Sequence, residues 1–293
     1  MKKTSSNFLY RTALFLLIPA IFVSSCKKDE EQIDKNTSSA VDHAFAESTF
    51  DDVGLMADQA AISGDLATYK NGSLQNGLLS TCATITFDTT VSPRIITIDF
   101  DTVNGSPCLD GRYRRGKVIV SYNGGYRDVG STHTISFDDY YVNDYKIEGT
   151  KTVTNAGQNS SGNTQFDISV VGHIISPQGA NLDWTSTRVR EWVEGEGSMW
   201  WTDDVYHITG TASGNSFGGE DFSAQITEPL VVDLGCVSPS PLIPKPVSLK
   251  DGILEFTPNG KYTRVIDYGY ENGDCDNKAK VTIADFEFTI ILR

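Results

Sequence analysis

The stretch Phe166-Asp167-Ile168-Ser169-Val170, "FDISV", decides the fold, because apolar and polar side chains alternate along it. In an extended chain this period of two places one set of side chains in a core and the other in solvent. The same alternation recurs in residues 96–100, 118–122, 222–226 and 286–292. Turn-forming pairs separate the runs, at Asn104-Gly105, Asn123-Gly124, Asn259-Gly260 and Asn272-Gly273. Strands this closely spaced leave no room for crossover helices, so the sequence predicts a mainly β fold: an antiparallel multi-stranded meander, either a curved sheet or a sandwich.

One segment before these strands has helical spacing instead. Apolar residues recur there at intervals of three and four, and acidic residues flank them. The apolar stripe comprises Val41, Ala44, Phe45, Val53, Met56, Ala57 and Ala60, and the flanking residues are Asp42, Glu47, Asp51 and Asp58. Ser39 is expected to cap the helix and Gly64 to end it. We therefore expect an amphipathic helix over about residues 40–63, with its stripe buried against the sheet.

The start of the chain has the pattern of a secretion signal. Basic Lys2, Lys3 and Arg11 precede an apolar run over residues 13–23, which is shorter than the roughly 20 residues that span a bilayer. Val23-Ser24-Ser25-Cys26 resembles the lipobox of bacterial lipoproteins, in which cleavage precedes the cysteine and its thiol carries diacylglycerol. We expect a signal peptide over residues 1–25, a lipidated Cys26 and a flexible tether over 26–39. The alternative is a cleaved secretion signal with an incidental cysteine.

The residues that follow the cysteine carry a second resemblance. Lys27-Lys28-Asp29-Glu30-Glu31 is similar to the lysine-then-acidic export signal that sends Bacteroidota lipoproteins to the outer face of the outer membrane. The resemblance implies attachment to the outer membrane through an N-terminal lipid, with the domain exposed at the cell surface.

The remainder of the chain is strongly acidic. The whole sequence has 24 Lys and Arg residues against 38 Asp and Glu. Three basic residues and no acidic ones precede Cys26, which leaves 21 against 38 and a net charge of −17. Such a surface repels phosphate backbones, so the composition argues against nucleic acid and against binding anionic lipid by charge.

Four cysteines remain after Cys26, namely Cys82, Cys108, Cys236 and Cys275. An exported compartment permits disulfides, and four cysteines allow three pairings. A similarity between two parts of the sequence favours one of these pairings. The first unit contains residues 98–100, Cys108 and residues 116–118, and the second contains similar residues at 266–268, Cys275 and 279–281. Another cysteine precedes each unit. We therefore predict Cys82–Cys108 and Cys236–Cys275. The echo suggests an internal duplication of residues 82–122 and 236–284, against the alternative of similar hairpins that arose independently.

A second, shorter echo lies between these units. Residues 145–150, "YKIEGT", parallel residues 206–211, "YHITGT", and an acidic pair precedes each. Duplication and independent origin are again the two explanations.

Candidate catalytic and metal-binding motifs are weak. Residues 214–218 match the GxSxG nucleophile pattern, which needs a strand-turn-helix setting and a later histidine. His43, His133, His173 and His207 all precede Ser216 and lack metal-ligand spacing. The acidic pairs at 51–52, 138–139 and 203–204 could serve as glycosidase carboxylates or calcium ligands, but solvated residues are the default in so acidic a chain. We predict no catalytic residue, no metal and no cofactor.

All four tryptophans lie between Trp184 and Tyr206. If "DWTSTRVREW", residues 183–192, is a strand, its even-numbered residues share one face, and arginine between indoles permits cation–π stacking. The candidate ligand-binding residues are Trp184, Arg188, Arg190, Trp192, Trp200 and Trp201. Such a face could bind a glycan or a protein partner at the cell surface. Aromatic packing within the sheet explains the same residues without a ligand and is favoured.

Several later stretches resemble a family of uncharacterised Bacteroidota surface lipoproteins. They are "TRVREWVEG", "WTDDVYHITGTASG", "ITEPL" and then "DYGYENGDCDNKAKVTI", which ends the likeness near a Cys-Asp-Asn-Lys-Ala stretch. The resemblance implies an N-terminal lipidation signal, an early helix and repeated β-hairpins. It implies no activity.

The sequence thus predicts a surface-anchored lipoprotein that acts as a non-catalytic binding or structural protein of the outer membrane. Two alternatives from other classes are a glycan-acting hydrolase that uses acidic side chains, and an apolar-ligand carrier. In the carrier, a curved sheet would hold a lipid against the helix of residues 41–60.

Overall fold

The computed structural model describes residues 33–64, 82–101, 106–108, 110–198, 203–236, 249–270, 273, 275–276 and 278–292. Within them lie one α-helix, α1 (Ser38–Gly64), a short 3-10 turn, η3 (Leu234–Cys236), and fourteen strands. The strands are β1 (Thr84–Asp88), β2 (Arg94–Asp99), β3 (Ser106–Pro107), β4 (Tyr113–Tyr122), β5 (Thr132–Val142), β6 (Tyr145–Gln158), β7 (Thr164–Ile175), β8 (Asn181–Glu194), β9 (Val205–Asn215), β10 (Asp221–Asp233), β11 (Leu249–Pro258), β12 (Arg264–Asp267), β13 (Lys278–Ile283) and β14 (Phe286–Ile291).

Some predicted features lie outside these residues. They are the signal peptide over 1–25, Cys26 with the export signal, Trp200 and Trp201. Within the described residues, no helix is both long and apolar enough to cross a membrane.

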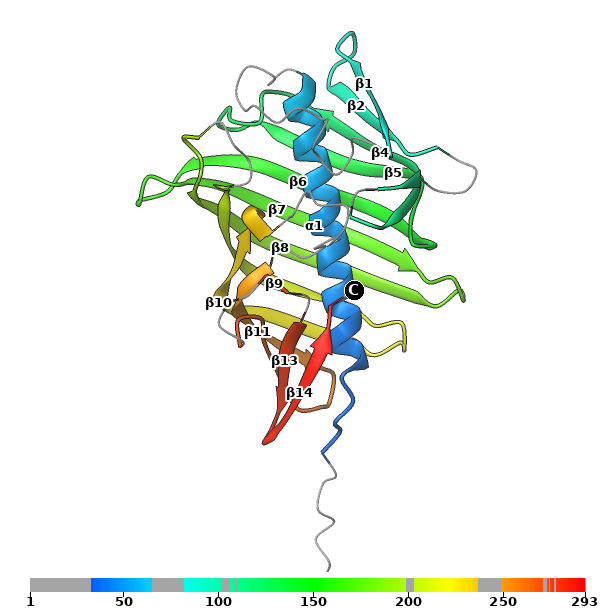
Figure 1. The fold of residues 1–293 in the computed structure, drawn as a ribbon, viewed down its shortest axis with the longest axis vertical. Helices are drawn as coiled ribbons and strands as arrows, with labels where there is room; N and C mark the ends of the chain where they lie inside the picture. The colour runs from blue at the N-terminus through cyan, green and yellow to red at the C-terminus, as the bar shows by residue number, and fades with distance from the viewer. Residues whose placement is uncertain are drawn as a thin grey trace, which may run out of the picture. The chain divides into compact units, whose positions relative to one another are not determined.

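The strands form a single antiparallel meander, which confirms the predicted fold class. Each strand pairs with the next along the chain from β1 to β14, except that β3 lies beside the path and pairs only with β4. The sheet curves around α1, so that the helix lies against its concave side (Figure 1). Of the two arrangements that the sequence left open, the protein adopts the curved sheet.

Two glycines in the central strands have a backbone conformation and close neighbours that a side chain would not allow. Gly149 in β6 has a φ of 112° and Gly210 in β9 a φ of 127°, values that favour glycine. A Cβ atom at Gly149 would lie 2.0 Å from the carbonyl oxygen of Val171, and one at Gly210 would lie 2.2 Å from that of Thr187. These are the glycines of the "YKIEGT" and "YHITGT" segments, so the two similar sequences have similar local structures.

The disulfides Cys82–Cys108 and Cys236–Cys275 are present as predicted. They hold two β-units with the same register. Ile98 pairs with Val118 as Ile266 pairs with Val281. The next residues along also correspond: Lys117 lies 3.3 Å from Asp99, and Lys280 lies 3.8 Å from Asp267. The first sequence echo therefore corresponds to equivalent structure near the two ends of the sheet.

Helix α1 is buried over more of its circumference than the predicted stripe. Val53, Met56 and Ala60 are fully buried as expected, but so is Phe50, which the stripe omitted. Glu47, expected at the solvent boundary, is only 5% exposed. The reason is the curvature of the sheet, which covers the helix on its flanks as well as beneath it (Figure 1). Ser39 is not the cap, since the helix begins at Ser38 and Thr37 accepts the hydrogen bond from the Val41 amide.

Residues 33–36, just before α1, are held by the domain and are not a free tether. Ile33 packs against the core. Asp34 lies 2.7 Å from Nζ of Lys261 and 3.2 Å from a guanidinium nitrogen of Arg264. Any free tether is therefore confined to residues before Ile33, which corrects the predicted range of 26–39.

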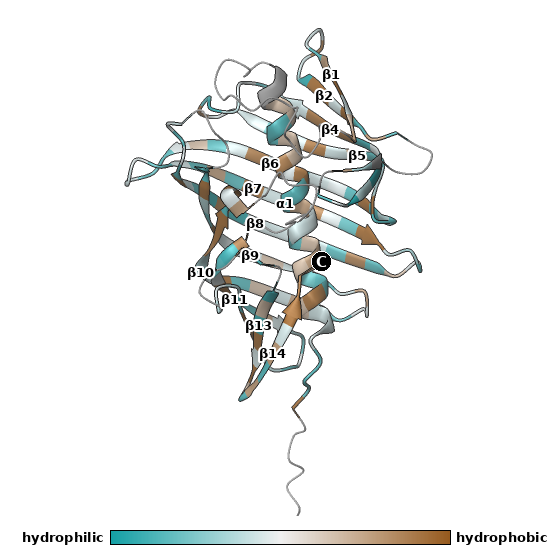
Figure 2. Ribbon diagram, viewed as in Figure 1, coloured by the Kyte–Doolittle hydropathy of each residue, from teal (hydrophilic) through white to brown (hydrophobic). Residues whose placement is uncertain are grey.

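Polar and apolar residues alternate along the central strands, as Figure 2 shows. Every second residue of β8 between Leu182 and Trp192 is buried on the concave side. The residues between them face outward, and Thr185 and Thr187 are exposed.

Candidate functional site

The concave face of the sheet is the most unusual part of the molecule, because buried basic side chains line it opposite an acidic helix. Five acidic residues and no Lys or Arg occur in α1. The buried basic residues of the strands that contact α1 are Arg114, Lys151, Arg188 and Arg190. Each of them forms an ion pair with an acidic residue of the helix. The helix and the groove that receives it are therefore complementary in charge.

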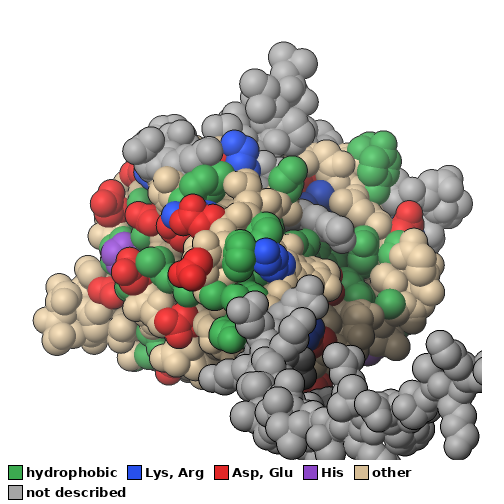
Figure 3. All heavy atoms as spheres, turned by 90° about the horizontal axis from the view of Figure 1, so that it is seen from below, with side chains coloured by type: hydrophobic (Ala, Val, Ile, Leu, Met, Phe, Trp, Pro, Cys, Tyr) green, Lys and Arg blue, Asp and Glu red, His purple; other side chains and the backbone are tan. Residues whose placement is uncertain are grey.

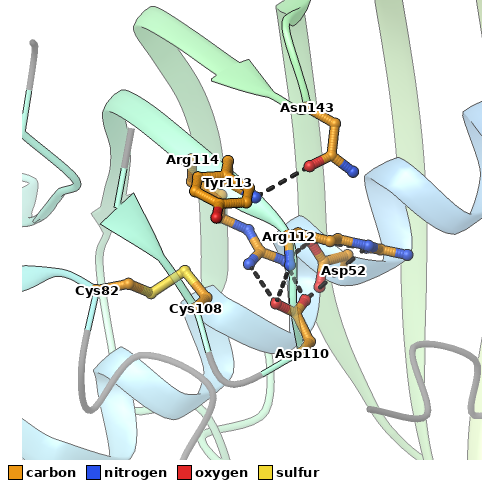
Figure 4. Close-up of a disulfide and its surroundings, with 8 residues drawn as sticks. All are labelled: Asp52, Cys82, Cys108, Asp110, Arg112, Tyr113, Arg114 and Asn143. Carbon is orange, nitrogen blue, oxygen red and sulfur yellow. Dashed lines mark hydrogen bonds and ion pairs between the residues drawn. A yellow bond between two sulfur atoms is a disulfide. The ribbon is translucent and has the colours of Figure 1, made fainter. Parts of the chain in front are cut away.

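The first of these pairs lies near the Cys82–Cys108 disulfide, as Figure 4 shows. The fully buried Arg114 donates to Asp52 at 2.7 Å and to both oxygens of Asp110 at 2.6 and 2.9 Å. Arg112 approaches Asp52 to 3.2 Å. Burial by itself would raise the pKa of Asp52, but the two guanidinium groups outweigh it and hold that pKa below its ordinary value. Asp52 is thus an ionised link between α1 and β4.

The second cluster lies around Glu47, near the middle of the groove. Arg188 donates to Oε1 of Glu47 through two nitrogens, at 2.6 and 3.2 Å. Trp184 Nε1 donates to Nδ1 of His43 at 3.1 Å, and Nε2 of the same imidazole lies 3.5 Å from Oε2 of Glu47. Burial would raise the pKa of Glu47, yet Arg188 and His43 lower it to about 2. Glu47 is therefore a buried carboxylate.

The third cluster surrounds Arg190. Its guanidinium group lies 3.4 Å from Asp58 and also donates to the Tyr126 hydroxyl. The same group lies 4.9 Å from the ring centre of Phe166 and 4.8 Å from that of Tyr206, within cation–π range. Burial is the main reason why the pKa of Tyr126 is raised far above its usual range.

The fourth contact involves the helix backbone. Lys151 donates from Nζ to the carbonyl oxygen of Phe50 at 2.8 Å and lies 3.3 Å from Asp51. A Cβ atom at Gly54 would lie 2.9 Å from Nζ. The glycine therefore makes room for the lysine, and the contact fixes the position of the helix along the groove.

The predicted ligand-binding face is an internal face of the domain. Trp184, Arg188, Arg190 and Trp192 point to the concave side together with Ser186, as the alternation predicted, but none is more than 7% exposed. Trp184, Arg188 and Arg190 contact the helix, and Trp192 donates to the buried Asp204 at 3.2 Å. Helix α1 covers this face, to which a glycan or a protein partner was predicted to bind. Trp200 and Trp201 lie outside the described residues.

Sequence reasoning missed Arg114 and Lys151 as parts of this face. A signal existed for both, because Arg114 is in phase with the apolar Val118 and Val120, and Lys151 with Val153. The helix gave a matching signal, because it contains no Lys or Arg and five acidic residues that could pair with these two basic residues of the sheet.

The remaining candidate motifs have ordinary structural roles. Ser216, in the GxSxG match, is buried in the turn between β9 and β10, and its Oγ accepts a hydrogen bond from the Glu220 amide. Asp138 and Asp139 are exposed, and Asp203 accepts a hydrogen bond from Ser198. In the part of the chain that the structure describes, no cluster of three or more His, Cys, Asp or Glu residues is placed to hold a metal ion.

Comparison of the chain with models of protein families, with curated proteins and with solved structures found no match.

Proposed function

We propose that this protein is a lipid-anchored, non-catalytic binding protein of the outer-membrane surface. The lipobox-like Val23-Ser24-Ser25-Cys26 and the charged segment after it support the location. One observation supports the non-catalytic binding role: α1 occupies the concave face and forms four ion pairs with its buried basic residues. A partner would then bind the outer surface of the sheet.

The geometry gives less support to a glycan-acting hydrolase. Such an enzyme needs one carboxylic acid whose pKa is raised, so that it can protonate the leaving group. The buried carboxylates of Glu47 and Asp52 instead have lowered pKa values beside arginine. Both also lie beneath the sheet, away from a polysaccharide in solvent.

An apolar-ligand carrier is also less well supported. A carrier needs space between the sheet and its covering helix. Here the ring of Phe50 lies so close to β7 that a Cβ atom at Gly172 would be 2.1 Å from it. The interior of a carrier is also mainly apolar, whereas four ion pairs cross this interface.

The convex face offers a different surface, formed by rows of hydroxyl side chains. One row follows the strand pairing from Thr152 through Ser169 and Thr187 to Thr211. A second row runs through Thr185, Ser213 and Ser223. Neither row contains a charged residue, in a chain whose net charge after Cys26 is −17. Hydroxyl groups both donate and accept hydrogen bonds, and rows of uncharged hydroxyl groups suit a neutral polysaccharide.

Binding of the full chain to immobilised neutral polysaccharides tests this function. The double variant Thr187→Lys, Thr211→Lys adds bulk and charge to the first row and should lose binding. Val129→Lys is the matched control, since Val129 is 75% exposed and lies in neither row, and it should bind as the wild type does. Equal binding by the double variant and the wild type would contradict a polysaccharide site on this face. Trp184→Ala is unsuitable here, because Trp184 is part of the core.

The location has its own test. Protease treatment of intact cells should release the domain, and Cys26→Ser should free the chain from the membrane fraction. Membrane retention of Cys26→Ser would contradict lipid anchoring, and protection from protease would contradict surface exposure.

A further inference from the structure

We propose that one end of the domain rests on the phospholipid bilayer, with Tyr262 and Phe286 as its aromatic contacts. This end comprises Ile33 to Lys35, the turn between β11 and β12 and the turn between β13 and β14. The inference rests on the proposed lipid at Cys26 and adds to it the orientation in which the domain is held.

Residues 33–36 are fixed on this end of the domain. Arg264 is fully buried, and it donates to Asp34 and to the carbonyl oxygen of Asn36, each at 3.2 Å. Lys261 forms ion pairs with Asp34 and with Glu220. Because the segment from Ile33 onward is held in this way, the domain cannot pivot freely about residues after Ile33.

The reach of the preceding chain is short. Seven peptide steps separate Cys26 from Ile33, and a fully extended chain covers at most about 25 Å over that length. The helix that starts beside this point has 27 residues and is about 40 Å long. A lipid on Cys26 would therefore hold the Ile33 end within about 25 Å of the bilayer, whereas the far end of α1 can lie about 40 Å further away.

The side chains at this end suit a membrane interface. Tyr262 is 42% exposed and Phe286 is 38% exposed. Nζ of Lys35 lies 3.3 Å from the centre of the Phe286 ring. Figure 3, which views the molecule from below, shows hydrophobic side chains next to a few Lys and Arg side chains, with a group of Asp and Glu side chains to one side. Aromatic rings with adjacent lysines are typical of protein surfaces at the level of lipid headgroups.

Site-specific photo-crosslinking tests the orientation. The lipidated full chain is reconstituted into vesicles of phosphatidylethanolamine and phosphatidylglycerol, with benzoylphenylalanine at position 286, 262 or 171. Position 171 is the control, because Val171 is 63% exposed but lies on the convex face. After irradiation, mass spectrometry should detect lipid adducts at 286 and 262 and only background at 171. Equal yields at the three positions, or a higher yield at 171, would overturn the proposal.

The same preparation separates this inference from the proposed function. If Cys26→Ser abolishes vesicle retention and the adducts still fail to favour 286 and 262, only the orientation is wrong. If retention does not depend on Cys26, both the lipid anchor and the orientation that rests on it are overturned.

Discussion

The ring of Phe50 in α1 lies directly on Gly172 of β7, where a Cβ atom would come within 2.1 Å of the ring. The same ring stacks on Trp184, the neighbour of Gly172 on the adjacent strand β8, with a centroid distance of 5.6 Å and an interplanar angle of 8°. The helix therefore approaches the sheet as closely as the absence of a side chain at position 172 allows. This contact and the four ion pairs make α1 part of the core.

Gly172→Ala should destabilise the domain, because the added methyl group cannot be placed without moving Phe50 or the helix. Overpacking of this kind costs about 1–3 kcal/mol, measurable by urea unfolding. Gly197→Ala is the matched control, since a Cβ atom there meets nothing within 4 Å. Adding Phe50→Leu to Gly172→Ala should cost less than the sum of the two single changes. Unchanged stability in Gly172→Ala would contradict the close contact.

Glu47→Gln should destabilise the protein at neutral pH, because it leaves the buried Arg188 without its carboxylate. Removal of one partner of a buried ion pair typically costs about 3–5 kcal/mol. The double variant Glu47→Leu, Arg188→Met should recover much of that loss, since it removes both charges. Glu228→Gln, at an exposed position in β10, serves as the control and should unfold like the wild type. A Glu47→Gln protein as stable as this control would mean that the pair is not buried as described.

The same carboxylate predicts a loss of stability in acid. The pKa of Glu47 is about 2 in the folded protein, against an ordinary value of 4.5. Because the folded pKa is the lower one, the stabilisation is fully present above about pH 4.5 and is lost as the pH falls towards 2. A pKa difference of this size corresponds to roughly 3 kcal/mol of unfolding free energy. Unfolding free energies measured across this range should fall less steeply in Glu47→Gln than in the wild type, and parallel curves would contradict the assignment.

Each disulfide should stabilise the domain independently of the other. The two bridges close loops of 26 and 39 residues, for which loop-closure entropy predicts about 3–4 kcal/mol each. The double variants Cys82→Ser, Cys108→Ser and Cys236→Ser, Cys275→Ser should each lower the unfolding free energy by about that amount. Peptide mapping without reductant checks the pairing, and a Cys82–Cys236 peptide would contradict it.

Local patterns in the sequence sufficed for the strands and the cysteine pairs. The alternation in residues 166–170 is that of a strand with one buried face, and the two repeated units indicated which cysteines pair. Both features depend on period and spacing, which are read within short segments. The same reasoning placed Trp184 and Arg188 on one face of β8.

The element that covers this face of β8 could not be predicted from short segments of the sequence. Arg188 and its partner Glu47 are 141 residues apart, and a helical stripe indicates which side is apolar without indicating how far a sheet curves around it. Glu47 therefore appeared to be a boundary residue. Only charge indicated this contact in the sequence. The Asp and Glu residues of the helix are matched by basic residues at inward-facing positions of the strands.

Hydrogen exchange of the backbone amides in α1, compared with those in β7 and β8, tests most directly whether the helix is a permanent part of the core. If the concave face is closed by α1, the helix amides should exchange only through global unfolding, with the same free energy of opening as β7 and β8. Exchange of α1 at a free energy several kcal/mol below that of the two strands would contradict this, because the helix would then open while the sheet stays folded and the concave face would be free to bind a ligand.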